Sequence, residues 1–144
     1  MEHLAILNKS EKDWLKLIVD GRKTIESRWY KCRCAPWDKI KAGESIFFKN
    51  SGLPVTVQAK VSKVLQMDNL NLGRVQEIYS KYGRQIGLDE EEIDQAINNK
   101  GDKKYCILVF LEKVKEIPPF SINKSGFGLM SAWISTESIA QIKR

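Results

Sequence analysis

Residues 21–28 read GRKTIESR, and WYK follows directly at residues 29–31. This stretch places a glycine, a lysine, a carboxylate and an arginine at fixed spacing, ahead of two aromatic residues and another lysine. The stretch is typical of a strand, yet strands usually bury apolar side chains, and this one carries charges instead. The pattern therefore indicates that a polar, anionic ligand lies against the strand.

The period-two geometry of a strand distributes these side chains over two faces. Glu26 and Arg28 share one face, and Lys23 lies at the turn before the strand, from which it can reach either side. Trp29 and Tyr30 are adjacent and point in opposite directions, so we expect at most one of them to line a cleft with the charged residues.

The positive charge of the chain is concentrated in one segment. The net charge is +6, and residues 22–49 hold eight basic and three acidic residues, whereas the other 116 residues are nearly balanced. Cations bind phosphates and flat aromatic rings stack on unpaired bases, so the segment is typical of a nucleic-acid-binding surface. A solvated basic face without a partner is the alternative.

Three further residues of the segment are candidates for that surface. Lys31 extends the basic stretch, and Lys49 lies on a later predicted strand whose side chains could reach the same cleft. Trp37, on a loop, could stack on a base or pack over one end of the fold.

Composition limits the class of protein. A length of 144 residues favours a single domain, residues 1–144. No run approaches the roughly 20 apolar residues of a membrane helix, and the N-terminus lacks the pattern of a signal peptide, so we expect a cytoplasmic protein without a membrane partner. Three cysteines and one histidine do not form a zinc-binding pattern, and we expect neither metal nor cofactor. The oligomeric state stays open.

Helices and strands alternate along the chain. Hydrophobic periodicity and capping residues predict strands at residues 4–7, 24–29, 45–50, 55–64 and 105–111, and helices at residues 10–20, 71–82 and 89–98. Ser10 and Asp89 are the expected N-caps, and Gly21 the left-handed residue after the first helix. The apolar run at 105–111 predicts a strand buried on both faces, and Pro118 and Pro119 are expected to end the segment after this strand. The predicted fold class is α+β: a small, closed or nearly closed β-barrel of five or six strands with peripheral helices.

The pattern Gly21-x-Lys23-x-x-Glu26-x-Arg28, between a helix and a strand, resembles the signature of the ASCH domain, a member of the PUA-like superfamily of β-barrels. The order of the later elements is similar too, over about residues 3 to 120. The resemblance implies a PUA-like barrel that binds RNA in a cleft lined by the signature strand.

The resemblance also implies that the chain could be an enzyme. One group of ASCH proteins hydrolyses the acyl-amide of N4-acetylcytidine with the signature lysine, a threonine three residues later and a glutamate from a later helix. Lys23 matches that lysine, but the position three residues later is Glu26, and Glu77 does not align with the catalytic acid. Other relatives are linked to ribonuclease activity, which also depends on the signature lysine. If the chain is an enzyme, Lys23 and Glu26 are the catalytic candidates.

Elementary electrostatics favours binding over covalent catalysis. A catalytic lysine must lose its proton near neutral pH, whereas a neighbouring carboxylate keeps it charged. Lys23, Glu26 and Arg28 therefore suit the capture of a phosphate or a base edge, although a purely structural ion network is the alternative. We expect RNA or a nucleotide-like small molecule as the ligand. A small hydrolase that acts on a modified nucleoside or on RNA, with Lys23 essential, is the rival hypothesis, and a module that binds an acidic protein is a third.

Overall fold

A six-stranded curled sheet organises the chain in the computed structural model, which describes residues 1–10, 12–128 and 131–144. The strands are β1 (Glu2–Leu7), β2 (Ile25–Tyr30), β3 (Ser45–Asn50), β4 (Val55–Met67), β5 (Tyr105–Phe120) and β6 (Trp133–Thr136). The helices are α1 (Trp14–Val19), α2 (Leu72–Ile86), α3 (Glu90–Asn99) and the 3-10 helix η1 (Ile139–Ile142). In the part of the chain that is described, no helix is long and apolar enough to cross a membrane.

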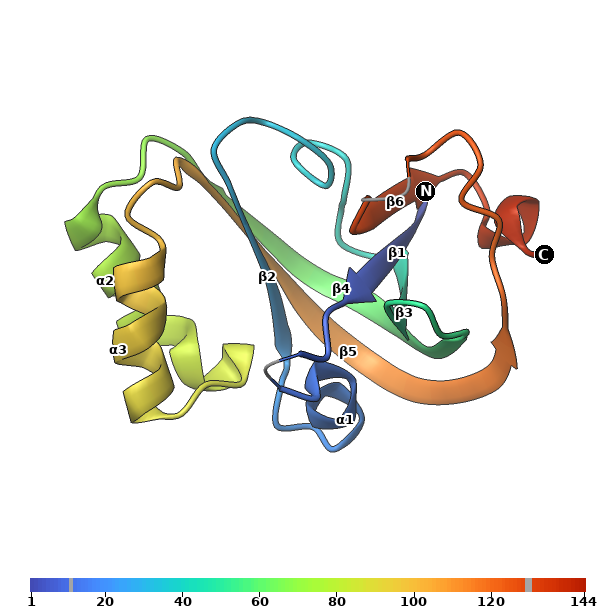
Figure 1. Ribbon diagram of the computed structural model, residues 1–144, viewed down its shortest axis with the longest axis horizontal. Helices are drawn as coiled ribbons and strands as arrows, with labels where there is room; N and C mark the ends of the chain where they lie inside the picture. Colours follow the sequence, from blue (N-terminus) through green and yellow to red (C-terminus); the bar gives the residue numbers. More distant parts are fainter. Residues whose placement is uncertain (11, 129–130) are drawn as a thin grey trace.

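The strand order β2-β5-β4-β3-β1-β6 makes β2 and β6 the edges of the sheet. Neighbouring strands are antiparallel except for β1 and β3, which are parallel. The sheet curls into a half-barrel, with α2 and α3 beyond β2 (Figure 1). The predicted α+β fold class is confirmed, and the barrel stays open beside β2.

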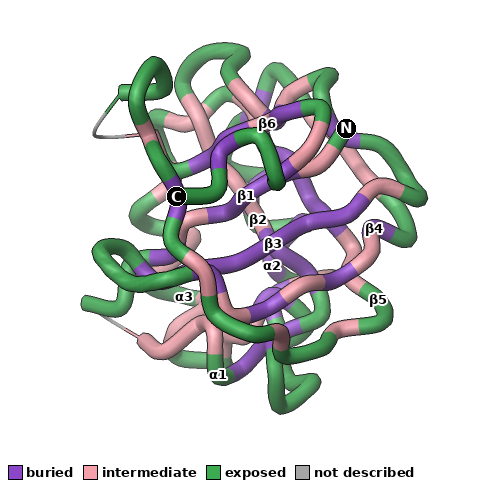
Figure 2. The backbone as a smooth tube through the Cα atoms, turned by 90° about the vertical axis from the view of Figure 1, so that its right-hand side faces the viewer, coloured by how far each residue is buried: buried purple, intermediate pink, exposed green. Residues whose placement is uncertain are grey.

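Every residue of β3 is buried (Figure 2), and so are the four residues of β5 that follow Tyr105. On β5, Ile107 and Val109 belong to the core inside the curl, whereas Cys106 and Leu108 pack into a second core with α2. This confirms the prediction of a strand buried on both faces. A third cluster on the outer face of β1 and β3 is covered by the C-terminal segment that includes η1.

Strand β5 is longer than predicted, because it continues through Pro118 and Pro119. Strand β2 pairs with β5 only between Tyr105 and Phe110. The rest of β5 has β4 as a neighbour on one side and no paired strand on the other. A proline is tolerated at such an edge, because its nitrogen carries no hydrogen and no strand on that side requires a hydrogen bond from it.

Helix α1 is shorter than predicted. It begins at Trp14, and its N-cap is Asp13, whose side chain accepts a hydrogen bond from the Lys16 N–H. The predicted Ser10 cap was therefore wrong, because the aspartate beside the first apolar residue supplies the acceptor instead. The other two predictions are confirmed: Asp89 caps α3, and Gly21 has a positive φ of 80°.

The single histidine joins three distant segments. His3 on β1 is fully buried, with its Nδ1 2.9 Å from Ser135 Oγ and its Nε2 2.9 Å from Glu44 Oε1. Burial lowers the pKa of His3, although the Glu44 carboxylate opposes this effect. The folded protein therefore favours the neutral imidazole.

We predict that stability falls as the pH decreases below the ordinary histidine pKa of 6.5. The unfolded chain binds the imidazole proton more readily than the folded protein, so the free energy of unfolding decreases by up to about 1.4 kcal/mol per pH unit. Urea unfolding between pH 7.5 and 5.5 measures this slope. The His3→Gln variant should flatten it, and an unchanged slope in the variant would contradict the assignment.

Candidate nucleic-acid-binding cleft

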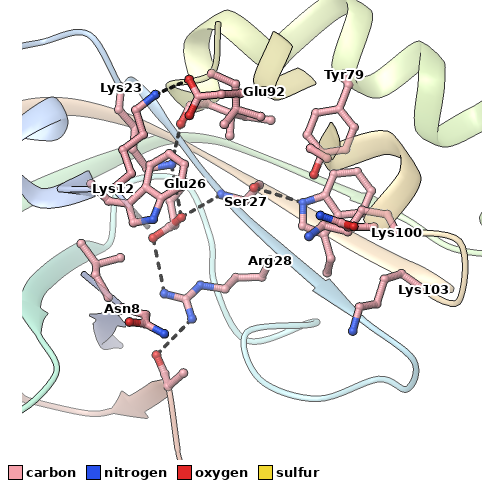
Figure 3. Close-up of a pocket in the computed structure, with 18 of the residues that line it drawn as sticks. Asn8, Lys12, Lys23, Glu26, Ser27, Arg28, Tyr79, Glu92, Lys100 and Lys103 are labelled. Carbon is pink, nitrogen blue, oxygen red and sulfur yellow. Dashed lines mark hydrogen bonds and ion pairs between the residues drawn. The ribbon is translucent and has the colours of Figure 1, made fainter. Parts of the chain in front are cut away.

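A cavity of about 510 Å³ follows the edge of β2 that β5 does not cover (Figure 3). Five consecutive residues of β2, Glu26 to Tyr30, line it. The end of β1 and Ala132 border it on one side, and α3 borders it on the other. The cleft therefore lies where the half-barrel stays open.

Glu26 lines the cleft with its carboxylate between Lys23 and Arg28, and the residue is 5% exposed. Its Oε1 accepts a hydrogen bond of 3.0 Å from the Ser27 N–H and lies 3.4 Å from Lys23 Nζ, while its Oε2 lies 3.4 Å from Arg28 Nη2. Burial acts to raise the pKa of Glu26, but the charges of Lys23 and Arg28 outweigh it and lower the pKa. Glu26 is therefore an ionised acceptor at neutral pH.

The Lys23 ammonium is directed inward, and the residue is 3% exposed. Its Nζ donates to the carbonyl oxygens of Ile25 at 2.9 Å and Ile86 at 2.8 Å, in addition to the ion pair with Glu26. Three acceptors match the three N–H groups of an ammonium. Burial lowers the pKa of Lys23, and the Glu26 charge opposes this. The geometry shows a lysine that holds β2 against the end of α2.

Turn geometry at two glycines places this lysine. After Gly21, the Lys23 N–H bonds to the Leu17 carbonyl, which brings the chain back beside α1. Gly87 follows Ile86 with a φ of 107°, a conformation that favours glycine, and thereby ends α2 where the Ile86 carbonyl meets Lys23.

The Arg28 guanidinium crosses the open side of the half-barrel. It donates to the carbonyl oxygens of Ala132 at 3.2 Å and Ile6 at 3.4 Å, and lies 5.2 Å from the Trp133 ring centroid. Ala132 precedes β6 and Ile6 belongs to β1, so one side chain connects both edges of the sheet.

Aromatic side chains form part of the walls. Trp29 stacks on Tyr79 of α2, with ring centroids 4.8 Å apart and an angle of 10° between the planes, and its Nε1 donates to Ser27 Oγ at 3.1 Å. Tyr30 also lines the cleft. The expectation that at most one of Trp29 and Tyr30 would do so was wrong, because the cleft follows the strand edge and meets both faces.

Structure adds cleft residues that the sequence did not single out. Lys12 crosses to α3, where its Nζ lies 2.6 Å from Glu92 Oε1 and donates to the Gly87 carbonyl at 2.8 Å. Lys100 and Lys103 line the cleft near the other end of α3. The sequence marks Glu92 as the residue that completes a capping box with Asp89, but that pattern predicts a helix start rather than a site.

Of the predicted site residues, Lys23, Glu26, Arg28, Trp29 and Tyr30 line this cleft, whereas Lys31, Trp37 and Lys49 do not. Lys31 pairs with Asp102 at 3.0 Å, Trp37 packs edge-on against Tyr105, and Lys49 is buried on β3. Glu77 is exposed on α2 and pairs with Arg74 at 3.0 Å. The glutamate of the helical region that borders the cleft is Glu92.

The fold is similar to solved structures. The ASCH structure from Zymomonas mobilis gives a TM-score of 0.67 at 20% identity, over 97% of this chain and 91% of that chain. A mutant of that protein gives 0.68 at 19% identity, over 97% and 93%. The N-terminal domain of Staphylothermus marinus McrB gives 0.51 at 15% identity, over 83% and 76%. No family model and no curated protein matches this sequence. The chain therefore has the ASCH-type fold that residues 21–28 predicted.

Proposed function

We propose that the chain binds RNA or a nucleotide-like ligand in the cleft along β2. The observation that carries the proposal is the pair of Glu26 and Arg28 beside the aromatic walls: an ionised acceptor next to a planar donor. Five lysine and arginine side chains and two glutamates line the cleft, which favours an anionic ligand. The cleft volume of about 510 Å³ lies within the range of pockets that bind small ligands.

The donor and acceptor complement the edge of a nucleobase. A guanidinium carries five N–H groups, and the bonds of Arg28 to Ile6, Ala132 and Glu26 leave capacity for a ligand carbonyl or phosphate. Glu26, which is ionised and lines the cleft, can accept a hydrogen bond from an exocyclic amine. Recognition of splayed bases by stacking and edge hydrogen bonds is the usual mode for single-stranded RNA.

The rival function is a hydrolase in which Lys23 acts as a base or nucleophile. The lowered pKa of buried Lys23 supports it. Against it, Lys23 Nζ is held by two carbonyl oxygens and Glu26, acceptors that favour the protonated form. Binding without turnover is therefore the function that the geometry supports best.

We predict that a labelled single-stranded RNA binds with an affinity that falls as salt rises, and that Arg28→Met weakens binding about tenfold or more. Hydrogen bonds to a charged group contribute about 1.5–3 kcal/mol each. Fluorescence anisotropy at two salt concentrations measures this, with circular dichroism to confirm folding. Arg74→Met, on the exposed face of α2, is the matched control. Equal loss in both variants would contradict a role for the cleft.

We predict that Lys23→Met lowers the free energy of unfolding by about 3 kcal/mol or more, because it removes one of the two cations that hold the buried Glu26 carboxylate and takes the lysine donor from two carbonyl groups. Urea unfolding measures the loss.

We further predict that RNA incubated with the wild-type protein stays intact on a denaturing gel. RNA cleavage that disappears in a folded Lys23→Met protein would instead support the ribonuclease.

A further inference from the structure

Lys49 on β3 is a buried cation without a counter-charge. The residue is 9% exposed, and no ion pair or hydrogen bond joins its side chain to another residue of the described chain. Its partners on the neighbouring strands are apolar, Ile6 on β1 and Val55 on β4. Burial lowers the pKa of Lys49, and the charge of Lys124 lowers it further. The surroundings of Lys49 therefore disfavour its ammonium.

Lys23 shows how the fold holds a lysine that has a structural role. It is the other buried lysine among the described residues, and its Nζ meets two carbonyl oxygens and the Glu26 carboxylate. Lys49 has no such acceptors. Because an unpaired buried charge lowers the stability of a fold, packing alone would favour an apolar side chain at this position. The charge of Lys49 thus points to an acceptor outside the chain.

The Lys49 ammonium stays accessible to such an acceptor. Among the described side chains, the one fully buried polar atom without a hydrogen-bond partner is Asn50 Oδ1. Lys49 Nζ has no partner either and is not such an atom, so it keeps contact with solvent. The apolar part of the side chain is covered while the charge reaches the surface, as is usual for a partly buried lysine.

Lys49 also lies beside the border of the cleft. Its register partner Ile6 lines the cleft at the end of β1. Lys124, whose charge acts on Lys49, donates from its Nζ to the Ser131 carbonyl at 3.1 Å. Ala132, which follows Ser131 in the chain, lines the cleft as well. Both lysines are therefore next to the border that β1 and Ala132 form.

We propose that Lys49 binds a backbone phosphate of the nucleic-acid strand whose base lies in the cleft, where this strand leaves the cleft over β1. The proposal rests on the proposed function and extends the ligand beyond the cleft. A phosphodiester supplies the negative charge and the acceptor oxygens that Lys49 lacks within the chain. Lys124 strengthens the local positive potential that attracts it. Since the contact is to the backbone, it adds affinity without base selectivity.

Salt titration of RNA binding tests the contact. A labelled single-stranded RNA of about ten nucleotides extends beyond one bound base and is measured by fluorescence anisotropy over a series of salt concentrations. Each phosphate contact of a single strand contributes about 0.7 to the slope of log affinity against log salt. Lys49→Met should weaken binding several-fold at low salt and reduce this slope by about 0.7. Lys81→Met, an exposed residue of α2 outside the cleft, is the matched control and should keep the wild-type slope.

Urea unfolding of the same variants gives an independent readout. Methionine keeps an unbranched apolar side chain and removes the charge, so Lys49→Met should leave the unfolding midpoint unchanged or raise it. This expectation is opposite to the loss predicted for Lys23→Met. A midpoint that falls in Lys49→Met would show that the lysine serves the fold, and would overturn the proposal.

The binding results separate this proposal from the function on which it rests. An unchanged salt slope in Lys49→Met, together with weakened binding in Arg28→Met, overturns the phosphate contact and leaves binding in the cleft intact. An equal decrease in slope for Lys49→Met and Lys81→Met overturns it too, because any surface lysine would then serve. If the wild-type protein binds no RNA, the proposed function itself is overturned.

Discussion

The buried Glu26 carboxylate is the interaction on which the rest of the site depends. It is held by a lysine on one side and an arginine on the other, and each cation continues to backbone carbonyl groups of other segments. Lys23 thereby connects β2 to α2, and Arg28 connects β2 to β1 and the start of β6. A buried carboxylate with one partner removed would be costly, so the three residues act as a unit.

The charged strand is also a solution to the problem of an exposed sheet edge. Unpaired backbone groups at an edge require partners or protection. Lys23 donates to the Ile25 carbonyl and Glu26 accepts from the Ser27 N–H, so side chains of the strand satisfy its own backbone. The same arrangement leaves space along the edge, and that space is the cleft. The structural role of these residues is thus combined with the ligand-binding role that we propose for them.

Burial and hydrogen bonding have opposite effects on the reactivity of Lys23. Burial lowers the pKa of Lys23, as catalysis by an amine requires, yet two carbonyl groups and a carboxylate surround its Nζ. The ammonium is positioned to hold Glu26 and the end of α2 rather than to face the cleft as a nucleophile. Glu26 and Arg28 are the groups of the signature that we propose as the ligand contacts.

The sequence by itself determined the α+β class, the left-handed turn at Gly21, most element positions and the charged strand, because turn chemistry and side-chain periodicity are local properties. The tertiary structure decided which side chains share the cleft. Arg28 and Ala132 are 104 residues apart, and Lys12 and Glu92 are 80 residues apart, so their contacts depend on the curl of the sheet and the placement of α3. Likewise, Trp29 and Tyr30 both border the cleft because β2 is an edge strand, a fact fixed by strand order rather than by alternation along the chain.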